Sequence, residues 1–349
     1  MPLAGLREVM GSVGRLKIDA EISADPLSDL PRLARQAEET GFDCIWVNET
    51  KHDPFIQVAT MLSSTHSVGL GTSVALAFTR SPTTLAYAAW DLNALSGGRL
   101  ILGLGSQVKG HIERRFGMKW GSPAPRMRET IEGIRAVWDS WQSGSKLDFR
   151  GRFFKLDLMT PFFSPGRIDH PGIPIYVAGV NRGMCQVAGE VGDGLHVHPL
   201  HTVRYIREVI SPALLAGLSR GGRRRGDVAV AASVFAAVGG RIEAKRVRSV
   251  CRNQVAFYAS TRTYRRVMEL HGWGDVCERL HSLSMKGEWG RMQEEVTDDI
   301  LDEFVVGGSW EEMGGILQKR YGGVVDRVRL YLPFDGGEGW KALVRGFRA

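Results

Sequence analysis

Signals for strands and helices alternate along most of this chain, and that alternation limits the folds available to it. Between the strand signals, apolar residues recur at helical spacing, as at Leu30, Leu33, Ala34 and Ala37. Parallel strands need crossover connections, so alternation favours a parallel sheet. Eight such units predict an α/β fold, a (β/α)8 TIM barrel with insertions in βα loops, and a doubly wound sheet is the alternative. The predicted strands are 16–23, 44–47, 68–76, 100–104, 174–178, 195–197, 227–238 and 328–332.

Two stretches, 144–171 and 240–302, do not follow this repeat. The first is rich in Phe, Pro and Gly, and the second has a helical pattern. We interpret both as insertions in βα loops of a single domain spanning 1–349, where they would roof a pocket. Their aromatic residues suggest an apolar or aromatic substrate, although packing of the insertions explains these side chains as well. These residues are Phe153, Phe154, Phe162, Phe163 and Trp273.

Several classes of protein are disfavoured by composition and patterning. The longest apolar stretch, 228–238, is about half of the ~20 residues that a membrane-spanning helix requires. No apolar core of a signal peptide forms before the first glycines and charges, so we expect a cytoplasmic protein without a membrane partner. The four cysteines are far apart and form no CxxC pair, which disfavours a disulfide scaffold or a structural zinc site.

The net charge of +7 leaves room for an anionic partner. The one tight basic run, 223–225, stands between glycines without interleaved aromatic residues, so we expect no nucleic-acid partner. A small molecule is the expected partner.

In such barrels the chemistry lies where strands end, so the residues that follow each strand are the candidates. After the second strand come Glu49, Thr50 and His52, whose carboxylate, hydroxyl and imidazole suit the orientation of a heterocycle or the movement of a proton. A solvated loop explains them equally well. The fourth strand ends in Gly103-Leu104-Gly105-Ser106-Gln107, where glycines allow either close approach of a ligand or a tight turn.

The ends of the fifth and sixth strands suggest two different ligands. Ala178, Gly179, Val180 and Asn181 lead into a helix whose free amide N–H groups suit a phosphate, although a capped helix start explains them too. The His-x-His pair His196 and His198 is the kind of pair that metal-dependent barrel hydrolases use. Such hydrolases carry it on the first strand, which here reads Lys17-Ile18-Asp19-Ala20-Glu21, so we expect no metal. Dinucleotide, P-loop, GxSxG and HExxH motifs are absent.

Taken together, several motifs resemble those of the bacterial luciferase-like family, and more closely its branch that uses the deazaflavin coenzyme F420. The resemblance spans about 16–333. It is carried by Glu49-Thr50-Lys51-His52-Asp53-Pro54, Gly71-Thr72-Ser73-Val74, Leu95-Ser96-Gly97-Gly98-Arg99, Leu102-Gly103-Leu104-Gly105, the run from His111 to Gly117, and Gly179-Val180-Asn181.

The resemblance implies a role for each of these segments. A bulge with a cis peptide at Ser73-Val74 would back the coenzyme ring, and Glu49 would contact it. Thr50 stands where the sugar-phosphate dehydrogenase relatives carry a histidine, and Val108 stands where they carry an acidic proton donor. Proton transfer would then pass to His52 or His111. The implied coenzyme site comprises Glu49, Thr50, Ser73, Val74, Gly105, Ser106, Gln107, His111, Ala178, Gly179, Val180, Asn181, His196 and His198.

The activity that the resemblance implies is hydride transfer between F420 and an unidentified, apolar or aromatic organic substrate. The alternative is an FMN-dependent, two-component monooxygenase. A basic chain suits the F420 tail, with its phosphodiester and several glutamates, better than FMN. A homodimer is expected by analogy with the family. At the tail site, we expect Gly179→Asp to exclude the coenzyme without affecting the fold.

Overall fold

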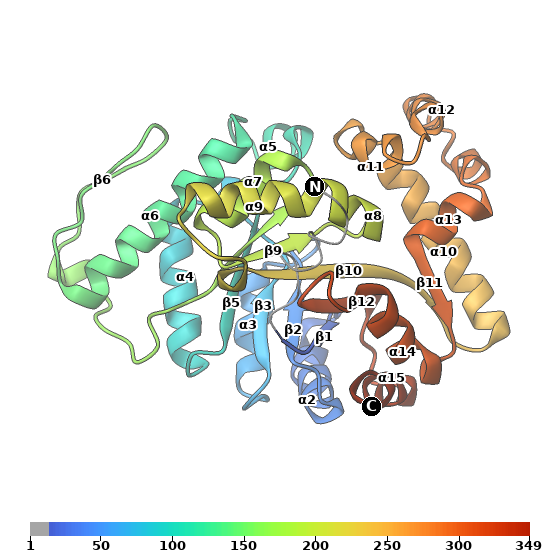
Figure 1. The fold of residues 1–349 in the computed structure, drawn as a ribbon. Helices are drawn as coiled ribbons and strands as arrows, with labels where there is room; N and C mark the ends of the chain where they lie inside the picture. Colours follow the sequence, from blue (N-terminus) through green and yellow to red (C-terminus); the bar gives the residue numbers. More distant parts are fainter. Residues whose placement is uncertain (1–13) are drawn as a thin grey trace.

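The structure is a computed structural model that describes residues 14–349. Eight parallel strands form a closed barrel, because β10 pairs with both β9 and β12 and so joins the two ends of the sheet (Figure 1). The predicted TIM barrel is therefore confirmed, and the doubly wound alternative is wrong. The barrel strands are β1 (Lys17–Glu21), β2 (Cys44–Val47), β3 (Gly69–Thr72), β5 (Leu100–Gly105), β8 (Ile175–Gly179), β9 (Gly194–Val197), β10 (Ala229–Val238) and β12 (Arg327–Pro333).

Helices surround the barrel and bury their apolar faces against it. Leu30, Leu33, Ala34 and Ala37 are all buried on one face of the first of them, and Gly41 ends that helix in the left-handed conformation (φ 93°). The helices of the barrel layer are α2 (Leu30–Thr40), α3 (Pro54–Leu62), α4 (Pro82–Leu95), α6 (Pro123–Ser143), α7 (Arg182–Val191), α8 (Val203–Tyr205) with the π turn Ile206–Ile210 and α9 (Ser211–Arg220), α14 (Trp310–Tyr321) and α15 (Glu338–Arg348).

The Leu-Ser-Gly-Gly-Arg motif shapes the N-terminal end of the barrel. Gly97 and Gly98 both have positive φ, at 64° and 87°, which explains the paired glycines. The Arg99 guanidinium then donates hydrogen bonds to the backbone oxygens of Val68 (2.8 Å) and Thr65 (3.0 Å). The motif therefore ties the start of β5 to the start of β3, at the opposite end from the predicted site.

The segment 144–171 differs in position from the prediction. It follows helix α6 and precedes strand β8, so it connects a helix to a strand and is not a βα loop. It contains a small hairpin, β6 (Phe149–Arg150) and β7 (Lys155–Leu156), that projects at the edge of the molecule in Figure 1.

Contacts of this segment place it on the outside of the helical layer. Tyr87 and Trp90, both on α4, donate to the backbone oxygens of Phe163 and Gly166. Phe162 is 88% exposed. The prediction of a roof over the pocket is wrong for Phe162 and Phe163, which are exposed on this outer side. Phe153 and Phe154 lie instead beside the first turns of α6, where the Glu129 carboxylate accepts both of their amides.

The segment 240–302 does follow a strand, and its helices lie beside the barrel mouth. β10 is ten residues long, and its second half pairs with a further strand, β11 (Val305–Gly308), outside the barrel ring. Between these strands run α10 (Arg241–Ala259), α11 (Arg265–Glu269), α12 (Gly274–Met285) and α13 (Asp298–Phe304), the orange part of Figure 1.

None of the helices within residues 14–349 combines the length and apolar character needed to cross a bilayer. The N-terminal residues that bear on the signal-peptide prediction lie outside the described part.

Candidate active site at the C-terminal end of the barrel

Unsatisfied buried polar atoms mark one end of the barrel. Within residues 14–349, five buried side-chain nitrogen or oxygen atoms have no hydrogen-bond partner, on His52, Asn181, His196 (both ring nitrogens) and Ser233. These residues lie on, or just after, β2, β8, β9 and β10. Buried polar atoms are nearly always hydrogen-bonded, so such exceptions need an explanation, and a ligand site is one. His52, Asn181 and His196 are among the site residues predicted from the sequence, but Ser233 is not. The one feature of the sequence that could have indicated Ser233 is a single hydroxyl within an otherwise apolar strand.

Two buried ion pairs fill the interior of the barrel beneath this end. Arg327 binds Asp19 (2.6 Å) and Arg329 binds Glu21 (3.0 Å), between the first and last strands. Burial disfavours the charge of Arg327, but Asp19 outweighs it, so the pKa of the guanidinium lies above its ordinary value. Sequence reasoning missed these pairs, although charges at alternate positions of β1 and β12 are a signal for a polar barrel interior.

The bulge after β3 has the predicted form. The Ser73-Val74 peptide bond is cis, and the chain continues into β4 (Ala75–Leu76), which pairs with β5. Arg329 also donates a hydrogen bond to the Ser73 hydroxyl (2.8 Å), so the buried Glu21–Arg329 pair supports the bulge from below.

Close packing in the protein itself explains the glycines of β5. A methyl group at Gly103 would lie 1.8 Å from the backbone oxygen of Thr72, and one at Gly105 would lie 2.4 Å from Cγ2 of Val74. The structure therefore gives these glycines a packing role that differs from both interpretations of the sequence, a ligand contact and a tight turn, since the neighbouring strand and bulge fill both positions.

The polar loop after β2 is organised around an arginine. Arg80 donates to the carboxylates of Glu49 (2.7 Å) and Asp53 (2.6 Å), and the Leu76 amide also donates to Glu49 (2.8 Å). Burial opposes the charge of Arg80, but the two carboxylates raise its pKa above the ordinary value. Glu49 therefore holds the far side of the bulge in place.

Thr50 and His52 lie on the loop after β2, and His111 lies in the segment after β5, which contacts that loop. His52 is half-buried, whereas Thr50 is exposed and donates to Asn48 (2.8 Å). His111 is exposed on the short helix α5 (Lys109–Arg114). Arg115, just after that helix, donates to the backbone oxygen of Thr50 (2.8 Å), which joins the two loops.

The segment between β5 and α5 lines the same end of the barrel. Ser106, Gln107 and Val108 are half-buried, and Gln107 has the unusual φ of 56°. Non-glycine residues in this conformation are uncommon and concentrate at functional sites.

The turn between β8 and α7 leaves helix N–H groups without a side-chain cap. Asn181 occupies the capping position, but its side chain donates instead to the backbone oxygen of Thr263 in the 240–302 segment (2.9 Å). The Tyr205 hydroxyl donates to the backbone oxygen of Val180 (3.0 Å) and fixes the other side of the turn. The first amides of α7 are therefore available to an anion.

The expectation that Gly179→Asp leaves the fold unaffected requires a correction. A methyl group there would lie 3.1 Å from Cδ1 of Leu195 and 3.2 Å from Cβ of Met184. A side chain at this position would press into the packing of α7 and β9, so Gly179→Asp should also destabilise the fold, contrary to our expectation.

His196 on β9 and His198 just after it are neutral and have different surroundings. His196 lies inside the barrel against the edge of Trp46 (ring centroids 4.6 Å apart), and burial, with Arg329 and Arg327, holds its pKa well below the ordinary value. Burial also lowers the pKa of His198, to about 3. Its Nδ1 accepts the Leu200 amide (3.1 Å), so its proton is on Nε2. Within residues 14–349, no three His, Cys, Asp or Glu side chains are placed to hold a metal ion.

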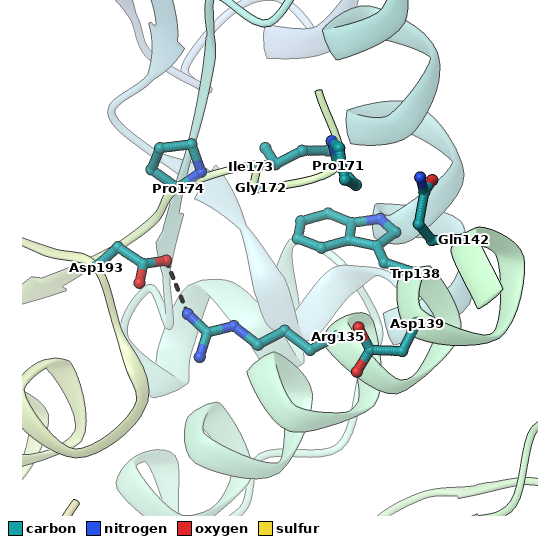
Figure 2. A pocket seen from close by; sticks show the side chains of 9 residues that line it. All are labelled: Arg135, Trp138, Asp139, Gln142, Pro171, Gly172, Ile173, Pro174 and Asp193. Carbon is teal, nitrogen blue, oxygen red and sulfur yellow. Dashed lines mark hydrogen bonds and ion pairs between the residues drawn. The ribbon is translucent and has the colours of Figure 1, made fainter. Parts of the chain in front are cut away.

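A separate pocket of about 640 Å³ lies outside the barrel (Figure 2). It is formed by the C-terminal half of α6 and the residues that precede β8, at the end of the barrel opposite to the strand ends discussed above. Arg135 is paired with Asp193 there (2.7 Å), and Gln142 bonds the backbone of Ile168. Because these polar groups are satisfied, we do not place the active site in this pocket.

The fold and these strand ends define a (β/α)8-barrel enzyme with its candidate site at the C-terminal ends of the strands. Residues 10–327 match the family model described as luciferase-like monooxygenase. The chain belongs to this family.

Among its relatives, a Mycobacterium tuberculosis protein described as uncharacterised is 44% identical over 97% of this chain and 100% of its own length. A 5,10-methylenetetrahydromethanopterin reductase of Archaeoglobus fulgidus is 30% identical over 82% of this chain and 83% of that protein. The structure of the coenzyme F420-dependent tetrahydromethanopterin reductase of Methanopyrus kandleri superposes with a TM-score of 0.76 at 20% identity, over 95% of this chain and 98% of that one. The relatives place the chain among the oxidoreductases of the F420-dependent branch.

Proposed function

We propose that this chain binds F420 at the C-terminal end of the barrel and catalyses hydride transfer between the coenzyme and an apolar or aromatic organic substrate. The observation that carries the proposal is the group of unsatisfied buried polar atoms on His52, Asn181, His196 and Ser233. They lie on, or just after, the barrel strands at the end that also carries the bulge at Ser73-Val74, where the family resemblance puts the coenzyme ring. When bound, the deazaflavin supplies the hydride chemistry, and the protein supplies binding, orientation and proton transfer.

The turn at the end of β8 suits the phosphate of the coenzyme. Its uncapped N–H groups face the site, and the N-terminal end of α7 carries a partial positive charge. The unpartnered Oδ1 of Asn181 is an acceptor of the kind that a ribityl hydroxyl satisfies. Backbone amides of 178–181 would therefore hold the phosphate, with His198 donating from Nε2.

Two arginines near this turn suit the glutamate tail. Arg182, the first residue of α7, and Arg266, on α11, have no acidic partner within residues 14–349. Burial raises the pKa of Tyr205 to about 12, and the charges of both arginines lie close enough to this tyrosine to lower that pKa. Because Tyr205 binds the turn itself, these charges flank the phosphate site. FMN has no tail to reach them.

Near the proposed position of the coenzyme ring, most side chains hold the Ser73-Val74 bulge in place, and few could transfer a proton. Glu49 and Arg329 hold the bulge from two sides, and Gly105 accommodates Val74 above it. His52 has an unpartnered Nε2, so it remains the better placed of the two candidate histidines for proton transfer, whereas His111 is exposed.

A titration of the purified protein with F420 and with FMN, followed by fluorescence, tests the proposal. We expect F420 to bind in the micromolar range or tighter, and FMN to bind much more weakly. Equal or tighter binding of FMN would contradict the proposal and favour a two-component monooxygenase.

A further inference from the structure

Two tyrosines meet at the mouth of the barrel, one from the barrel and one from the 240–302 segment. Tyr331 is on β12 and Tyr258 on α10, and their hydroxyl oxygens lie 2.8 Å apart. Both side chains are half-buried. Such a pair has two hydroxyl hydrogens and uses one for the bond between them. No other residue of the described chain bonds either hydroxyl, so one O–H remains available to a third group.

Strand geometry places this pair one layer above the proposed ring site. Arg329 and Tyr331 are alternate residues of β12, so their side chains lie on the same side of the strand. Arg329 bonds Ser73 in the bulge, and two residues of a strand advance by about 7 Å. The phenols therefore lie nearer to the mouth than Ser73, on the side from which a substrate would enter.

The surroundings of the pair are aromatic. The ring of Phe235 lies 5.1 Å from that of Tyr331, and the ring of His198 lies 4.7 Å from that of Tyr258. A ligand that fits here has an apolar or aromatic body and one oxygen that accepts a hydrogen bond. A ketone or an aldehyde has this chemistry.

We propose that the Tyr258–Tyr331 pair donates a proton to the carbonyl oxygen of an apolar or aromatic ketone or aldehyde, as its carbon receives a hydride from the reduced deazaflavin. This inference rests on the proposed function. The hydride forms the new C–H bond, the π pair of the carbonyl moves to oxygen, and a phenol O–H bond breaks to form the alcohol O–H. The carbonyl compound is reduced by two electrons and the deazaflavin is oxidised by two. Solvent then returns a proton to the phenolate.

The electrostatics of the pair favour the protonated form of both phenols. Burial raises the pKa of both phenols, and Glu21 adds to the effect, whereas Arg329 acts against it at Tyr331. Both hydroxyls are therefore protonated at neutral pH. An alkoxide is a stronger base than a phenolate, so the proton moves toward the developing alcohol.

Kinetics of phenylalanine variants test the proposal. Reduced F420 would be mixed with acetone, cyclohexanone or acetophenone, and its oxidation followed by absorbance. We expect turnover of at least one ketone by the wild type, and a fall in kcat of roughly a hundredfold or more for Tyr258→Phe and Tyr331→Phe. Tyr264→Phe is the matched control, because its hydroxyl bonds no other residue in the described chain, and it should retain wild-type turnover.

A binding measurement that needs no turnover separates proton donation from structure. Acetophenone labelled with ¹³C at the carbonyl would be bound to the protein with oxidised F420, and its NMR signal recorded. A hydrogen bond from the pair should move the carbonyl signal downfield, and the double variant Tyr258→Phe, Tyr331→Phe should remove that shift while the affinity for F420 stays unchanged.

The possible outcomes distinguish the two proposals. Failure of the wild type to bind F420 would overturn both proposals. Binding of F420 without reduction of any ketone, or full turnover by both phenylalanine variants, would overturn the inference on the tyrosine pair and leave the proposed function standing.

Discussion

Nη1 of Arg80 lies 2.7 Å from Oε2 of Glu49, and both side chains are largely buried beside the bulge that the coenzyme ring is proposed to contact. This pair is a structural support, because Glu49 also accepts the backbone amide of Leu76. The ion pair therefore connects the polar loop after β2 to the segment after β3.

Loss of the Glu49 charge should destabilise the protein. Glu49→Gln leaves the buried Arg80 with Asp53 as its one remaining carboxylate, and we expect a loss of about 1–3 kcal/mol in the free energy of unfolding. Denaturant titration measures this loss. The control is Asp25→Asn, whose ion pair with Lys51 is exposed and should contribute less than about 1 kcal/mol. Equal effects of the two variants would show that the Arg80 pair has no special role.

Gly105→Ala should disturb the bulge directly. The added methyl group meets Cγ2 of Val74 at 2.4 Å, so Val74 must move, at a cost of roughly 1–3 kcal/mol typical of overpacking. Thermal unfolding and F420 titration should both show a loss. The control is Gly110→Ala in α5, where a methyl group meets nothing within 4 Å. An unchanged affinity for F420 in Gly105→Ala would mean that the coenzyme ring does not depend on Val74.

Charge reversal near the phosphate turn should weaken F420 binding selectively. The double variant Arg182→Glu, Arg266→Glu places two negative charges beside the proposed tail, and we expect at least about a tenfold rise in the Kd for F420, equivalent to ~1.4 kcal/mol. The effect should shrink as salt screens the charges. Arg345→Glu on α15 is a control for altered net charge. If the double variant binds F420 as tightly as wild type, the tail lies elsewhere.

Acid should destabilise the protein by protonating Glu38, a carboxylate at the N-terminal end of the barrel. Glu38 accepts the backbone amides of His66, Ser67 and Val68. Burial acts to raise its pKa, but these hydrogen bonds prevail and lower it from 4.5 to about 2. Because the pKa is lower in the folded state, the stabilisation is complete above pH 4.5 and is lost as the pH falls toward 2.

Glu38→Gln tests this dependence. The variant should be less stable than wild type at pH 6, and the difference in unfolding free energy should narrow as the pH falls from 4.5 to 2. The control is Glu39→Gln on the same helix, which should follow the wild-type profile because Glu39 is exposed. A difference that stays constant over this range would assign the stabilisation to something other than the charge of Glu38.

The barrel, the family resemblance and most of the strand ends could be predicted from the amino-acid sequence alone. Short apolar runs and 3.6-residue periods are local features, so strands such as Cys44–Val47 and helices such as Leu30–Thr40 could be located from their own residues. The residues that follow each strand could then be named, because a parallel barrel brings all these ends together. The cis bond at Ser73-Val74 followed from the resemblance alone.

The pairing of these residues, and the choice of segments that reach the site, depend on how the elements pack together. The ion pair of Glu21 with Arg329 joins residues 308 positions apart, and the hydroxyl bond of Tyr258 to Tyr331 joins an insertion to the last strand. A local pattern states which side chains share a face of their own element, but not which other element packs against that face. For the same reason the segment 144–171, aromatic in composition, could be assigned to the outer layer only once α6 was seen to end before it.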